Sequence, residues 1–85
     1  MQSFTYVIRD EIGMHARPAG LLAKQAKGFA SSCKIHAGEK SADLTRLFQV
    51  MGLGIRQGTQ VVVTAEGPDE SEAIESLKKV LEKNL

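Results

Sequence analysis

A histidine and an arginine stand two positions apart where a helical pattern begins, in the stretch His15-Ala16-Arg17-Pro18. A neutral imidazole carries a lone pair that can act as a nucleophile, and a guanidinium has a planar fork that fits phosphate oxygens. At this spacing, His15 could accept a phosphoryl group and Arg17 could hold the oxygens of that group. Such a transfer requires neither a metal ligand set nor a separate general base.

Pro18 indicates where the helix starts. Proline has no N–H group, so it is tolerated in the first turn, where N–H groups have no acceptor inside the helix. We therefore expect Ala16 to be the first helical residue and His15 to be the N-cap. The N–H groups of Ala16 and Arg17 would then point outward in the positive field of the helix dipole, where an anion can bind. The same field and the Arg17 guanidinium favour a neutral His15 ring near neutral pH.

The stretch alone leaves three interpretations of His15 open. It can be an N-cap or solvated surface residue, part of a simple anion-binding site, or a phosphoryl acceptor. Four residues are too few to establish a reaction class.

The composition is typical of an ordinary globular domain. The 85 residues are expected to form one domain, residues 1–85, with a modest core and no deep cleft. Eleven basic and ten acidic residues give a net charge of +1, which argues against binding to nucleic acid or to an anionic membrane. The single Cys33 excludes an internal disulfide and is consistent with a cytoplasmic location. The pattern predicts no secretion signal and no membrane span.

Alternation of apolar and polar residues predicts four strands, and a spacing of about 3.6 residues predicts three helices. We expect strands over residues 4–8, 33–37, 40–43 and 59–66. We expect helices over residues 16–27 and 44–51 and from residue 70 toward the end. The order β-α-β-β-α-β-α, with amphipathic strands and one-sided helices, indicates an α+β fold in which helices cover one face of an antiparallel sheet.

For two of these elements, the strand over residues 59–66 and the last helix, the sequence predicts more detail. The strand over residues 59–66 is rich in β-branched residues, and we expect it to have a hairpin partner. The last helix has a strong start signal, because Asp69 can be its N-cap and Glu72 can complete a capping box.

The helix over residues 44–51 is unusually apolar for its length. It holds five large apolar side chains, namely Leu44, Leu47, Phe48, Val50 and Met51. Either all of them belong to the core or some face outward and bind a protein. Lys24 and Lys27 on the first helix are equally ambiguous, since they can be a solvated face or can attract an acidic partner.

Cys33 and His36 are the only other pair that suggests a ligand site. Three residues apart on a strand, their side chains point to opposite faces. We therefore expect a buried cysteine, an exposed histidine and no metal site, and we expect no cofactor.

Three stretches resemble the HPr family, the histidine-containing phosphocarriers of the bacterial phosphoenolpyruvate-dependent sugar phosphotransferase system. They are "GMHARPAG" around His15, "AKGF" at residues 26–29 and "LGIRQGT" at residues 53–59. Length and element order agree as well, so the resemblance covers essentially the whole chain. It implies the open-faced β-sandwich of that family, with four antiparallel strands and three helices on one face. It also implies a phosphoryl carrier rather than an enzyme, acting in sugar transport.

The resemblance implies roles for individual residues. His15 would accept a phosphoryl group on Nδ1 from phosphorylated enzyme I and pass it to an enzyme IIA domain. Arg17 and the N–H groups of Ala16 and Arg17 would hold the phosphate. The family's docking surface would here consist of Gly20, Lys24, Lys27, Leu47, Phe48 and Met51. A cytoplasmic monomer is expected.

The chain departs from the family pattern at three positions. Arg46 stands where many members carry a regulatory serine, so a fixed positive charge replaces a switchable negative one. Ile12 stands where the family often has a polar residue near the phosphate, and Gly20 replaces a more usual alanine. Two other functions stay open: a regulatory or interaction module on the same fold, and a carrier for a specialised nitrogen-related or dihydroxyacetone branch.

Overall fold

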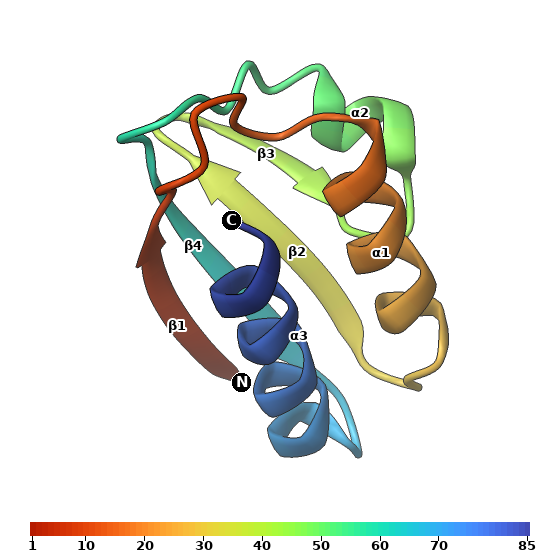
Figure 1. The fold of residues 1–85 in the computed structure, drawn as a ribbon. Helices are drawn as coiled ribbons and strands as arrows, with labels where there is room; N and C mark the ends of the chain where they lie inside the picture. Colours follow the sequence, from red (N-terminus) through yellow and green to blue (C-terminus); the bar gives the residue numbers. More distant parts are fainter.

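The computed structural model describes residues 1–85 and contains one antiparallel sheet with three helices on one of its faces (Figure 1). The strands are β1 (Gln2–Val7), β2 (Ser32–Ala37), β3 (Lys40–Asp43) and β4 (Gln60–Glu66). The helices are α1 (Ala16–Lys27), α2 (Leu47–Met51) and α3 (Glu70–Asn84). The element order and the one-sided helix layer confirm the predicted α+β, open-faced β-sandwich fold. None of the three helices has the length and apolar character needed to cross a membrane.

The strand order is β1-β4-β2-β3, and β4 therefore lies inside the sheet. It pairs antiparallel with both β1 and β2, and only β2 and β3 are joined as a hairpin. The expected hairpin partner of β4 does not exist, because the chain reaches β4 from α2 and leaves it for α3. This interior position explains why β4 is the most β-branched strand, since both of its edges are paired.

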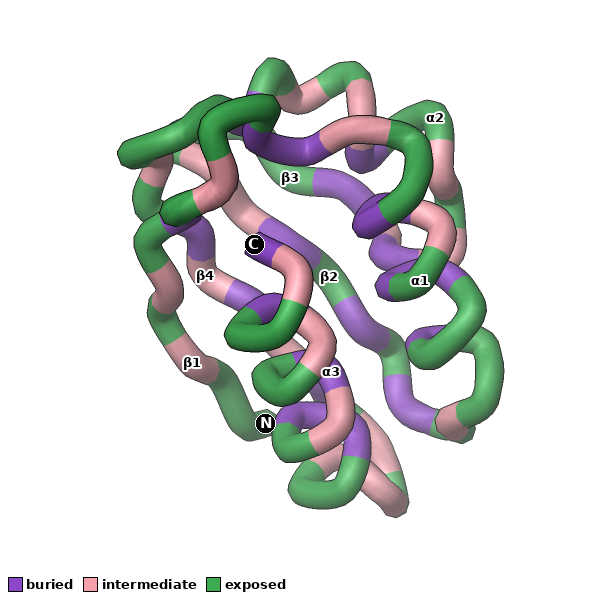
Figure 2. Tube along the Cα trace, in the orientation of Figure 1, coloured by how far each residue is buried: buried purple, intermediate pink, exposed green.

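The core lies between the sheet and the helix layer. Buried and exposed positions alternate along β2 and β4, and buried positions line the inner sides of α1 and α3 (Figure 2). Helix α1 contacts both α2 and α3, so it is the middle helix of the layer. Each large side chain that is fully buried contributes about 1.5–3 kcal/mol to folding. The largest of these side chains are Ile8, Leu22, Ile35, Leu44, Val50, Val61, Val63, Leu77 and Leu81.

The second helix is shorter than predicted. It begins at Leu47 rather than Leu44, because Asp43 forms a turn with the residues that follow. The Asp43 Oδ1 atom accepts hydrogen bonds from the Thr45 N–H group (2.9 Å) and the Thr45 hydroxyl (2.7 Å). Such local bonds compete with helical ones. The turn directs Leu44 fully into the core before the helix starts.

Asp69 precedes α3 as predicted, but the expected capping box with Glu72 is not formed. The Asp69 carboxylate instead accepts hydrogen bonds from the Ala30 N–H group (2.8 Å), the Ser31 N–H group (2.9 Å) and the Ser31 hydroxyl. The bonds from the Ser31 hydroxyl and the Ala30 N–H group lower the pKa of Asp69 below its ordinary value, because they favour the ionised form. Asp69 thus fastens the start of α3 to the segment between α1 and β2.

The loop between β1 and α1 is held against the segment that precedes β4. The Met14 N–H group donates to the Ile55 carbonyl (3.0 Å), and the Gly58 N–H group donates to the Ile8 carbonyl (2.8 Å). Gly13 has a φ of +77°, and a β-carbon there would lie 2.6 Å from the Ile55 carbonyl oxygen. Only glycine fits this close approach.

Gly13→Ala is expected to lower the free energy of unfolding by at least about 1–2 kcal/mol, because a β-carbon disfavours left-handed backbone. The clash with Ile55 adds to this cost. Gly20→Ala is the matched control, since Gly20 lies within α1 and an added β-carbon meets no atom within 4 Å. It is expected to raise stability by about 0.5–1 kcal/mol. Urea unfolding of both variants checks this, and equal effects of the two substitutions would contradict it.

Asp69→Asn is expected to lower the free energy of unfolding at neutral pH, and to lower it less at acidic pH. A carboxyl group whose pKa is lowered on folding contributes stability above its unfolded value, near 3.8, and loses that contribution as the pH falls through the folded value. The urea midpoints of the variant and the parent should therefore converge as the pH falls through the pKa that Asp69 has in the folded protein. Glu75→Gln, at an exposed position of α3, serves as a control for charge alone. A gap between variant and parent that does not change with pH would refute the role of Asp69.

Candidate functional site

His15 is the N-cap of α1, as predicted from Pro18. Its backbone is extended, with φ −129° and ψ −177°, and its carbonyl accepts the first helical hydrogen bond, from the Ala19 N–H group (3.0 Å). The side chain is half-buried and makes no capping hydrogen bond. The imidazole is therefore held at the helix start without being engaged by the helix itself.

The N–H groups of Ala16 and Arg17 donate no hydrogen bond within the chain. They belong to the first turn, where the helix offers no acceptor, and Pro18 has no N–H group to compete with them. Pro18 is buried, which fixes the turn against the core. Two donors and the positive end of the helix dipole thus lie beside His15, and an anion is favoured there.

A shallow hollow of about 330 Å³ lies next to the imidazole. It brings His15 and Arg17 together, as predicted, and adds two charged residues that the sequence patterns did not indicate, Asp10 and Lys83. Its charges are thus two cations and one carboxylate. The lining residues are Asp10, Ile12, His15, Arg17, Pro18, Lys83 and Asn84.

Lys83 reaches this hollow because the end of α3 is fastened to the loop that precedes α1. The N–H groups of Arg9 and Asp10 both donate to the Leu85 carbonyl, and the Arg9 guanidinium donates to the Glu82 carbonyl (3.0 Å). No local pattern in the sequence indicates this contact between its two ends. Only the tertiary structure places Lys83 next to Arg17.

A second hollow, of about 390 Å³, lies between α1 and α3. Arg17, Lys83 and Asn84 line both hollows, so the second one continues the first. Its lining includes three cations and no acid. The residues are Arg17, Leu21, Gln25, Lys79, Val80, Lys83 and Asn84.

The apolar residues of the region over 44–51 divide between core and surface. Leu44 and Val50 are fully buried, whereas the Phe48 side chain is 84% exposed. Leu47 and Met51 are half-buried. This division confirms the interpretation that part of the apolar surface of α2 faces outward.

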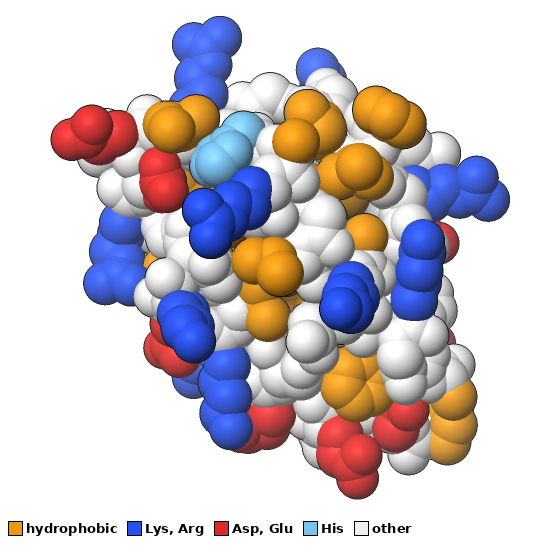
Figure 3. Space-filling view, turned by 45° about the vertical axis from the view of Figure 1, so that its right-hand side comes forward, with side chains coloured by type: hydrophobic (Ala, Val, Ile, Leu, Met, Phe, Trp, Pro, Cys, Tyr) orange, Lys and Arg blue, Asp and Glu red, His pale blue; other side chains and the backbone are white.

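The residues expected to dock partners on α1 are also accessible. Lys24 and Lys27 are exposed, and Gly20 is half-buried. Hydrophobic and basic side chains gather around a histidine on the face formed by α1 and α2 (Figure 3). Arg46 is exposed and is the N-cap of α2. The bonds from Thr45 lower the pKa of Asp43, and the charge of Arg46 adds to that effect.

The open face of the sheet carries no comparable arrangement. Cys33 is buried, and burial raises the pKa of its thiol, which disfavours the reactive thiolate. His36 lies on the other face, where its Nε2 atom is 3.5 Å from the Thr64 hydroxyl. These positions confirm that Cys33 and His36 point apart. No three His, Cys, Asp or Glu side chains lie close enough to hold a metal ion.

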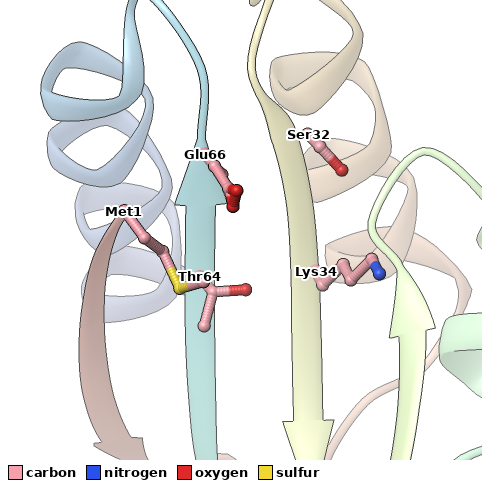
Figure 4. A pocket seen from close by; sticks show the side chains of 5 residues that line it. All are labelled: Met1, Ser32, Lys34, Thr64 and Glu66. Atoms are coloured by element: carbon pink, nitrogen blue, oxygen red, sulfur yellow. The ribbon is translucent and has the colours of Figure 1, made fainter.

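A further hollow of about 330 Å³ lies on this open face, over the ends of β2 and β4 (Figure 4). Its lining residues are Met1, Ser32, Lys34, Thr64 and Glu66. Its lining includes one cationic side chain and one side-chain carboxylate, and no histidine or cysteine. It therefore offers no nucleophile with an activating partner.

Comparison with known proteins identifies the family. Residues 2–83 match the family described as PTS HPr component phosphorylation site. The chain is 40% identical over 81 residues to the phosphocarrier protein HPr of Mycoplasma capricolum, a match that covers 95% of this chain and 91% of that protein.

Solved structures give the same answer. A histidine-containing phosphocarrier protein of Mycoplasma superposes with a TM-score of 0.94 at 38% identity, covering 96% of this chain and 93% of that one. A dimer of HPr from Thermoanaerobacter tengcongensis superposes with a TM-score of 0.77 at 36% identity, covering 98% and 95%. The chain therefore belongs to the HPr family of phosphocarrier proteins of the phosphotransferase system.

Proposed function

We propose that this chain accepts a phosphoryl group on Nδ1 of His15 from phosphorylated enzyme I and passes it to an enzyme IIA domain. The observation that carries the proposal is the geometry of the α1 start. There an imidazole without a capping bond shares one hollow with Arg17 and lies beside two N–H groups that have no acceptor. Family membership supplies the phosphocarrier activity, and this geometry supports His15 as the acceptor.

The transfer balances without a cofactor. The lone pair on Nδ1 of neutral His15 forms the nitrogen–phosphorus bond while the bond between phosphorus and the donor breaks and leaves its electron pair on the donor. The ring keeps its proton on Nε2. The negative charge of the arriving group meets the N–H groups of Ala16 and Arg17 and the Arg17 guanidinium, which are already in place. In the transfer to enzyme IIA, a nucleophile of that domain forms a bond to phosphorus while the nitrogen–phosphorus bond breaks and returns its electron pair to Nδ1 of His15.

The docking surface for both partners is proposed to surround His15. It consists of Gly20, Lys24, Lys27, Leu47, Phe48 and Met51. An exposed aromatic ring on α2 and exposed lysines on the adjoining α1 fit a partner surface with an apolar centre and an acidic rim. Action as a cytoplasmic monomer is part of this proposal. Arg46 has no hydroxyl, so no phosphorylation switch is proposed at that position.

Incubation with phosphoenolpyruvate and catalytic enzyme I is expected to place one acid-labile phosphate on each molecule. His15→Ala should remove all of the label, because the acceptor nitrogen is lost. The measurement is incorporation of radioactive phosphate, combined with mass spectrometry of the intact protein.

His36→Ala is the matched control, because it removes the only other histidine from the opposite face of the sheet. This variant should be labelled like the parent. Equal labelling of His15→Ala and the parent would exclude His15 as acceptor. Absence of any label would contradict the carrier function and leave a regulatory or interaction module.

Phe48→Ala is expected to raise the KM of enzyme I for this protein about five- to tenfold, as for an interface residue whose truncation costs about 1 kcal/mol of binding. The free energy of unfolding should hardly change, because the ring is 84% exposed. Val7→Ala is the control: Val7 is 49% exposed but lies on β1, at the opposite edge of the sheet from β3, which α2 contacts. An unchanged KM for Phe48→Ala would remove Phe48 from the docking surface.

A further inference from the structure

We propose that Lys83 is a second cation for the phosphoryl group on His15 and that its ammonium group contacts the phosphoryl oxygens opposite Arg17. This proposal rests on the proposed function of His15. Lys83 and Arg17 line the same hollow of about 330 Å³ next to the imidazole, and they are its only two cations. They come from helices α3 and α1, so they approach the hollow from two elements.

The position of Lys83 is fixed by the backbone around it. Leu81 and Leu85 are buried on either side of it in the chain, which anchors the last turn of α3 in the core. The Asn84 side chain donates to the Val80 carbonyl (2.9 Å) and supports the same turn. The Lys83 backbone is thus held at the rim, and its long flexible side chain can reach an arriving anion.

The charges in the hollow explain why a second cation matters. Asp10 contributes a carboxylate, and its Oδ1 atom accepts a hydrogen bond from the Ile12 N–H group (2.8 Å). Without Lys83, the positive charge of Arg17 would be balanced by the negative charge of Asp10, and the pair would give a phosphate dianion little electrostatic stabilisation. Lys83 gives the hollow an excess of positive charge.

Two further features favour this role. The Ile12 side chain is 70% exposed and has no polar group, so it offers the phosphate no hydrogen bond. The carbonyl groups at the end of α3 would repel a phosphate, but the Arg9 guanidinium donates to one of them, that of Glu82, and the Arg9 N–H group donates to the Leu85 carbonyl just past the helix. Lys83 is the one cationic side chain of α3 that lines this hollow, and its ammonium group can donate a charge-assisted hydrogen bond to the phosphoryl group.

The test compares the phosphorylated forms of the parent, Lys83→Gln, Lys83→Arg and Lys78→Gln. Each protein is phosphorylated with excess phosphoenolpyruvate and enzyme I, and the phosphohistidine is titrated by phosphorus NMR at low salt. Lys83→Gln should raise the pKa of the phosphoryl group, because the dianion loses a cation. The ionisation constant should change about two- to fivefold, as for an exposed ion pair, and the change should shrink at high salt.

Lys78→Gln is the control of equal charge, because Lys78 lies on α3 but lines neither hollow beside Arg17. It should leave the phosphoryl pKa unchanged, and Lys83→Arg should restore the parent value. A parent protein that takes up no label would refute the carrier function. A labelled parent with the same phosphoryl pKa as Lys83→Gln, or equal shifts in Lys83→Gln and Lys78→Gln, would overturn the role of Lys83 alone.

Discussion

The close approach between Gly13 and the backbone at Ile55 is the constraint on which the site depends. Because Gly13 has no side chain, the Met14 N–H group can reach the Ile55 carbonyl, and the loop enters α1 from a fixed direction. His15 follows in an extended conformation, and Pro18 lies in the first turn. The imidazole and the two N–H donors of the first turn are consequently held next to one another before any ligand arrives, which is the preorganisation that anion binding and transfer require.

The sheet supplies this constraint. Strands β1 and β4 are neighbours, and their ladder continues past the strands in a bond from the Ile8 N–H group to the Thr59 carbonyl (3.0 Å). The loop that follows β1 and the loop that precedes β4 therefore meet at the same end of these two strands. The backbone of "LGIRQGT" thus holds the loop that carries His15.

The sequence predicted what depends on neighbouring residues. Pro18 located the start of α1, alternation located the strands, and the excess of apolar residues over 44–51 indicated a partly exposed helix. The turn at Asp43 was missed, although an aspartate two residues before Thr45 is a known signal for it. The Asp69 contacts with Ser31 and the place of Lys83 could not be predicted, because each joins segments far apart in the chain.

A shallow site suits a protein that must release what it accepts. Exposed ion pairs contribute about 0.2–1 kcal/mol each, so Arg17 and a second cation can favour the phosphorylated form without trapping it. A deep charged pocket would hold the group more firmly and would also hinder the approach of a second protein. Separating the two tasks avoids this conflict, because in the proposed docking surface Phe48 and the lysines of α1 would bind partners with energy that does not depend on where the phosphoryl group lies. The small core of this chain is sufficient for such a division, since it has only to hold the start of α1 rigid at the surface.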